Sequence, residues 1–87
     1  MKTNYQAILT TELAIKAVKQ NGCDLKYVKE QTEEVCLAAV KQDGYALRYV
    51  KEQTDKVCLA AVKEDIYALQ YVLDLDLFNR IALICNI

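Results

Sequence analysis

The sequence predicts an all-α fold, a small α-solenoid of about seven to eight short helices arranged in pairs. Residues 32–41 recur almost unchanged as residues 54–63, and residues 45–50 recur as residues 67–72. The period is 22 residues without insertions, which is typical of one small unit stacked on copies of itself. The chain has no proline and only two glycines, so its connections must be short.

The repeat divides the 87 residues into a single helical-repeat domain. We expect a half unit at 1–9, full units at 10–31, 32–53 and 54–75, and a C-terminal capping helix at 76–87. A chain of this size buries only just enough surface to fold alone, so contact between units should supply most of its stability.

Each unit begins with a predicted first helix, at about 11–20, 33–42 and 55–64, and a fourth such helix at 77–86 ends the chain. The residues expected to cap these helices, spaced 22 apart, are Thr10, Thr32, Thr54 and Asp76. Their side-chain oxygens can accept a hydrogen bond from the first turn. Acidic residues follow in the first turn of the first three of these helices, as the helix dipole favours.

A second short helix is predicted at about 23–30, 45–52 and 67–73. The turns before it read Asn21-Gly22, Asp43-Gly44 and Asp65-Ile66. A left-handed backbone would strain an isoleucine at the last of these positions. We therefore expect Asn or Asp to cap the second helix and Gly or Ile to be its first residue, so that Gly22→Ala should be tolerated or mildly stabilising.

The apolar pattern distinguishes the two kinds of helix. The first helix of each middle unit is apolar nearly all round, which predicts an interior position, whereas the second helix has a polar side and should form the surface. The last helix is also very apolar. Either it folds back onto the third unit, or it exposes a patch for self-association or for a partner. We therefore expect a monomer or a homodimer through the C-terminal helix.

The residues that usually carry chemistry are sparse. There is no histidine, and no two of the four cysteines have Cys-x-x-Cys spacing. Cys36 and Cys58 share one repeat position, where buried, reduced thiols are expected. No phosphate-binding loop or paired catalytic carboxylates appear. We predict that the protein is not an enzyme and uses no cofactor or metal.

Tyrosines and basic residues recur together in the second helices, and apolar residues crowd the last helix. The candidate interaction residues are Lys26, Tyr27, Lys29, Arg48, Tyr49, Lys51, Phe78, Ile84 and Ile87. The tyrosines could seal the seams between units and the lysines could be a solvated face; alternatively, both form a binding surface. Departures from the repeat also indicate candidate surfaces: Ile66, the apolar last helix and the loss of basic residues in the third unit.

Charge and targeting signals narrow the classes of partner. The net charge of −1 implies no general affinity for nucleic acid. Residues 1–31 carry five lysines against three acidic residues, whereas residues 54–75 carry two against four. We expect no membrane span and a cytoplasmic location, in the producing cell or in a viral host cell.

Residues 35–50, with the sequence VCLAAVKQDGYALRYV, resemble the repeats of domain-of-unknown-function family 4116. These are short tandem helical repeats found in bacteria and large DNA viruses, and the likeness spans roughly residues 10–75. The resemblance implies an all-helical repeat fold. It brings no established activity and no site residues.

We expect a non-enzymatic protein–protein interaction module, either a stand-alone adaptor or a small phage- or virus-encoded inhibitor of a host or defence protein. The alternative is a nucleic-acid-binding module that uses the Tyr/Lys/Arg row of the second helices.

Overall fold

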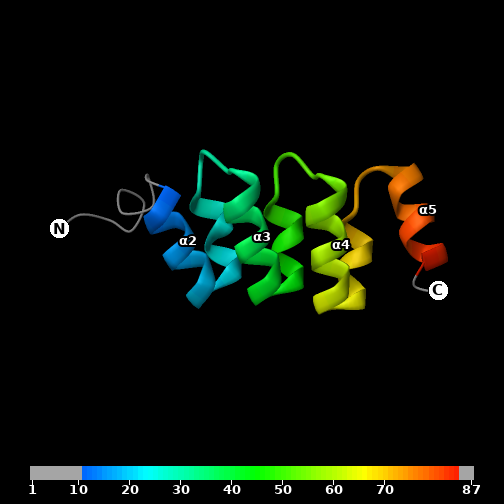
Figure 1. Cartoon of the computed structure of the whole chain (residues 1–87), viewed down its shortest axis with the longest axis horizontal. Helices are drawn as coiled ribbons and strands as arrows, with labels where there is room; N and C mark the ends of the chain where they lie inside the picture. Colours follow the sequence, from blue (N-terminus) through cyan, green and yellow to red (C-terminus); the bar gives the residue numbers. More distant parts are fainter. Residues whose placement is uncertain (1–10, 85–87) are drawn as a thin grey trace.

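The computed structural model describes residues 11–84 and contains, in that range, helices and no strand (Figure 1). Four α-helices of ten residues alternate with three 3-10 helices of six residues. In chain order they are α2 (Thr11–Gln20), η1 (Gly22–Tyr27), α3 (Glu33–Gln42), η2 (Gly44–Tyr49), α4 (Asp55–Glu64), η3 (Ile66–Tyr71) and α5 (Leu75–Ile84). The predicted all-α repeat fold is confirmed.

Several of the residues considered in the sequence analysis lie at the ends of the chain. The half unit at 1–9 and the cap Thr10 lie outside the described residues, as do Cys85 and Ile87. Within residues 11–84 no helix has the length and apolarity needed to cross a bilayer.

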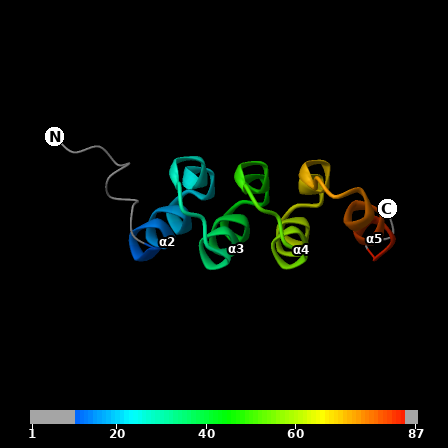
Figure 2. The ribbon, with the colours of Figure 1, turned by 90° about the horizontal axis from the view of Figure 1, so that it is seen from above.

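The helices form two layers with the core between them. Figure 2 shows the α-helices in one row and the 3-10 helices in a parallel row. Leu25 and Leu47 of the 3-10 layer are fully buried, as are Val35 and Val40 of α3. The second helices have the predicted exposed polar side, as at Arg48, and bury their apolar side. The α-helices are less completely interior than predicted, since Leu59 of α4 is 36% exposed.

The predicted α-helix caps Thr32 and Thr54 of the two middle units are confirmed. The Thr32 hydroxyl accepts a hydrogen bond from the Val35 amide at 3.2 Å, and the Thr54 hydroxyl accepts one from the Val57 amide at 3.2 Å. Each bond satisfies an amide that has no partner within its own helix.

The 3-10 helices start as predicted but end earlier. Asn21, Asp43 and Asp65 cap them with extended backbones, so Gly22, Gly44 and Ile66 are the first helical residues. The predicted ends at residues 30, 52 and 73 are wrong. Each helix stops at a tyrosine, and the following valine is extended, which turns the chain back toward the α-helical layer.

The last helix departs from the register of the repeat. The pattern placed its cap at Asp76 and its start at residue 77, but α5 begins at Leu75. The Asp74 carboxylate accepts hydrogen bonds from the amides of Asp76 and Leu77, at 2.9 and 3.2 Å. Asp74 is therefore the cap, and the preceding connection is two residues shorter than in the other units.

The last helix buries one side and exposes apolar residues on another. Leu77 and Ile81 of α5 are buried, being 5% and 0% exposed, so one side of the helix packs back onto the stack. Leu75 and Leu83 remain 71% and 81% exposed. The register shift thus leaves a considerable part of this helix uncovered.

Candidate functional site

A glutamine ties each unit to the next one. The Gln31 amide group donates to the backbone oxygens of Leu25, Val28 and Tyr49, at 3.3, 3.3 and 2.9 Å. Its carbonyl oxygen accepts from the amide of Lys51 at 2.9 Å. One side chain thus forms hydrogen bonds with backbone groups of two successive units.

Gln53 repeats this arrangement between the second and third units. It donates to the carbonyl oxygens of Leu47 and Tyr71, at 3.5 and 2.8 Å, and accepts from the Leu73 amide at 3.0 Å. Sequence reasoning missed this role. The signal was present, since glutamine recurs 22 residues apart and leucine replaces it at Leu75.

The two glycines allow backbones of adjacent units to approach. A Cβ atom at Gly22 would lie 2.4 Å from the carbonyl oxygen of Ala39, and one at Gly44 would lie 2.6 Å from that of Ala61. The expectation that Gly22→Ala is tolerated is therefore wrong. Neither glycine has a left-handed backbone; the neighbouring carbonyl group, and not the backbone conformation, excludes a side chain.

Ile66 occupies the same repeat position in the third unit and is 43% exposed. A side chain fits here because α5, out of register, brings no carbonyl group against it. The replacement of glycine by isoleucine at residue 66 therefore coincides with the end of the regular stack.

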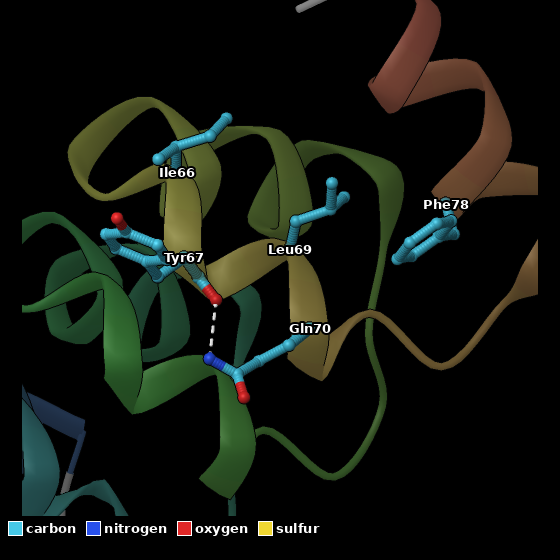
Figure 3. A pocket seen from close by; sticks show the side chains of 5 residues that line it. All are labelled: Ile66, Tyr67, Leu69, Gln70 and Phe78. Carbon is cyan, nitrogen blue, oxygen red and sulfur yellow. Dashed lines mark hydrogen bonds between the residues drawn. The ribbon is translucent and has the colours of Figure 1, made fainter. Parts of the chain in front are cut away.

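An apolar groove, which we call the C-terminal groove, opens at this end of the stack. It has a volume of about 540 Å³ and is lined by Ile66, Tyr67, Leu69, Gln70 and Phe78. Figure 3 shows four of these side chains on η3, with Phe78 reaching toward them from α5. The Gln70 amide donates to the Tyr67 carbonyl oxygen at 3.0 Å, which fixes one polar side chain at the rim.

Exposed apolar side chains also occur on η3, on the segment after it and on α5. Among the large apolar residues whose exposure the structure describes, those of the third unit and α5 are the most exposed. They include Tyr67 at 68%, Leu73 at 78%, Leu75 at 71% and Leu83 at 81%. Of the groove residues, Phe78 was among the candidate interaction residues, and Ile66 was a departure from the repeat that indicated a candidate surface.

The tyrosine and basic candidates come together on η1 and η2. The Lys26 ammonium lies 5.2 Å from the centre of the Tyr27 ring and 5.9 Å from that of Tyr49. The Arg48 guanidinium lies 4.9 Å from the Tyr49 ring centre. We call these four residues the cation–π row. They form a continuous contact between the first two units, and Gln70 ends it in the third.

The remaining candidates are separate from this row. The Lys51 ammonium donates to the Lys29 carbonyl oxygen at 3.3 Å, so this pair links two connecting segments. Ile84 belongs to α5. Of the candidate residues, the structure thus brings Lys26, Tyr27, Arg48 and Tyr49 together in the cation–π row and places Phe78 in the C-terminal groove.

The thiols in the core are poor nucleophiles. Burial, with a contribution from Glu33, raises the pKa of Cys36 to about 11. Burial and the nearby carboxylates of Asp55 and Asp74 raise the pKa of Cys58 to about 11. Both thiols are therefore protonated at neutral pH. No group of metal-ligating side chains occurs within residues 11–84.

Comparison with known proteins identifies the repeat. The family model described as Domain of unknown function (DUF4116) matches twice, at residues 11–55 and 32–76. The two matches overlap, as expected for tandem copies of one unit. No curated protein and no solved structure matches the chain. Because the matches together cover most of its length, the chain belongs to the family Domain of unknown function (DUF4116).

Proposed function

We propose that the protein is a non-enzymatic interaction module that binds another protein through the C-terminal groove. This class includes a stand-alone adaptor and a phage- or virus-encoded inhibitor of a host protein. The identity of the partner would distinguish them.

The observation that carries the proposal is the exposure of apolar surface at one end of the stack. Tyr67 is 68% exposed beside a groove of about 540 Å³, while its equivalent Tyr45 is half-buried and contacts Tyr71 edge-on, with 5.8 Å between ring centres. Contiguous apolar surface on a small protein commonly marks a protein-binding site, and aromatic residues are enriched in such sites.

Site-specific photocrosslinking tests the proposal. A benzoylphenylalanine at position 67 should capture a partner protein in the source cell that the same group at position 27 does not capture. The purified partner should bind the wild-type chain at least tenfold more tightly than it binds the Tyr67→Ala variant. Equal capture at both positions, or unchanged affinity, would contradict the proposal.

A second candidate function is nucleic-acid binding through the cation–π row. Lys26, Arg48 and the partly exposed tyrosines supply positive charge and aromatic faces on one surface, the usual means of binding single strands. Binding of a labelled single-stranded oligonucleotide should then weaken steeply with salt and fall in Lys26→Ala. Absence of binding at low salt would eliminate this candidate.

A further inference from the structure

The outer side of α5 carries apolar residues that no other element of residues 11–84 covers. Leu75 and Leu83 are 71% and 81% exposed, and Asn79 between them is also exposed. The buried residues Leu77 and Ile81 lie on the opposite side of the helix, because α-helical residues two apart differ in direction by about 200°. Figure 2 shows α5 at the end of the row of α-helices, so this outer side faces away from the stack.

The residues Leu75, Asn79 and Leu83, which we call the outer stripe, read the same in both directions. They follow one another at intervals of four residues and form one ridge along α5, with a leucine at each end and the asparagine at its centre. Two copies of this ridge can meet antiparallel about a two-fold axis at Asn79. Each Leu75 then lies against Leu83 of the other copy, which gives the self-complementary surface that a two-fold dimer requires.

Asn79 meets its own counterpart in this arrangement. Its side chain has both a carbonyl oxygen and an amino group, so two copies can donate to and accept from each other. A single asparagine within an apolar seam between helices fixes their register. The position of Asn79 between two leucines of a helix, where asparagine is not a favoured residue, is consistent with that role.

The charged residues beside the outer stripe are opposite in sign. Asp76 and Arg80 each follow a stripe residue by one position, so both lie along the same edge of the stripe and both are exposed. In the antiparallel arrangement Arg80 of one copy lies beside Asp76 of the other, and the two-fold axis produces this pair twice. Because the edge carries both signs, it complements a second copy better than a uniformly basic or acidic partner.

Arg80 is available for this pairing. Its guanidinium lies 3.7 Å from the Asp55 carboxylate, and both side chains are 63% exposed. An exposed ion pair of this kind contributes little to stability, so exchanging it for a contact with the second copy costs little.

We propose that the chain forms a two-fold homodimer through the outer stripe of α5. The inference goes beyond the proposed function, because α5 contributes Phe78 and no stripe residue to the C-terminal groove. A helix of ten residues offers less area than a standard stable interface. The dimer is therefore weak, with a Kd in the micromolar range.

Sedimentation equilibrium of the full chain, with a reductant to prevent intermolecular disulfides, measures the association. The average mass should rise with concentration from the 9.9 kDa of the monomer toward twice that value. Asn79→Asp brings two carboxylates together at the axis, and Leu83→Lys puts a charge into the apolar contact, so each should weaken dimerisation at least tenfold. Tyr67→Ala removes an exposed apolar side chain of the groove and should change dimerisation less than threefold.

Exchange of the two charges tests the antiparallel register. Asp76→Arg and Arg80→Asp should each weaken dimerisation at least threefold, because like charges then meet across the interface. The double variant with both substitutions restores opposite charges and should dimerise within twofold of the wild type. Asp55 cannot account for this rescue, since its contact with Arg80 is lost in the double variant as well. Circular dichroism verifies that each variant is folded.

Three results would overturn the inference. These are a monomer mass up to millimolar concentration, a dimer that Tyr67→Ala dissociates and Leu83→Lys leaves intact, or a double charge variant that dimerises as weakly as the single ones. Photocrosslinking through position 67 does not depend on the outer stripe. If it captures a partner while the chain stays monomeric, the proposed function stands and the homodimer is wrong; a dimer without capture gives the reverse.

Discussion

The backbone of Gly22 lies directly against the carbonyl oxygen of Ala39 in the next unit, so close that a Cβ atom would be 2.4 Å from that oxygen. Gly44 and Ala61 repeat the relationship one unit further along. Adjacent units are therefore held at a separation that only glycine permits at this position.

The first prediction concerns this separation. Gly22→Ala and Gly44→Ala should each lower the free energy of unfolding by about 1–3 kcal/mol, because the units must move apart to admit a methyl group. Urea denaturation followed by circular dichroism measures the change. Ile66→Ala, at the same repeat position without the carbonyl contact, should change stability by less than about 1 kcal/mol. An unchanged midpoint for both glycine variants would contradict this account.

The second prediction concerns the linking glutamines. Gln31→Ala removes the partner of several backbone groups, and the Gln53→Ala change does the same in the next unit. Each should cost about 1–2 kcal/mol, since several hydrogen bonds are lost at once and the carbonyl groups among these partners are only partly accessible to water. Gln20→Ala, at an exposed position of α2, is the control and should change stability by less than about 0.5 kcal/mol. Equal losses of stability in all three variants would contradict a specific contribution from the hydrogen bonds of Gln31 and Gln53.

The repeat made most of the architecture predictable. The period correctly predicted the starts of α3 and α4 and their caps Thr32 and Thr54, because the same local sequence pattern occurs in each copy of the unit. The contacts between units were not predictable in the same way. Gly22 faces Ala39 across 17 residues of chain, and no local pattern reveals a close approach over that distance.

The candidate site was predictable only through departures from the repeat. Ile66 and the missing basic residues pointed to the third unit, and Phe78 was among the candidates. Tyr67 was not, because it matches Tyr45 in sequence. Its exposure arises from the absence of a following unit in register, which depends on where α5 packs and not on the identity of residue 67.

The third prediction distinguishes the two possible caps of α5. Asp74→Ala should lower the free energy of unfolding by about 1 kcal/mol, because its carboxylate accepts hydrogen bonds from two amides of the first turn. Asp76→Ala removes a carboxylate for which the structure gives no capping bond, so its effect should be clearly smaller. Thermal unfolding of the two variants side by side makes the comparison. A larger loss for Asp76→Ala would place the cap where the unbroken repeat had put it.

The last prediction concerns the core thiols and alkaline pH. The pKa of Cys36 and that of Cys58 rise from 9.0 to about 11 on folding, so between these values the folded state holds more protons than the unfolded state. Stability from this source is complete below about pH 9 and is lost as pH rises toward 11, because the unfolded chain gains by ionising first.

Denaturation in urea at pH 8.0 and pH 10.5 measures this effect. The wild-type chain should lose more stability over that interval than the Cys36→Ala, Cys58→Ala double variant, in which the tyrosines and lysines still titrate. The difference between the two proteins isolates the thiols. If both lose the same amount, the thiols ionise alike in the folded and unfolded chains, and the burial of Cys36 and Cys58 does not control their protonation.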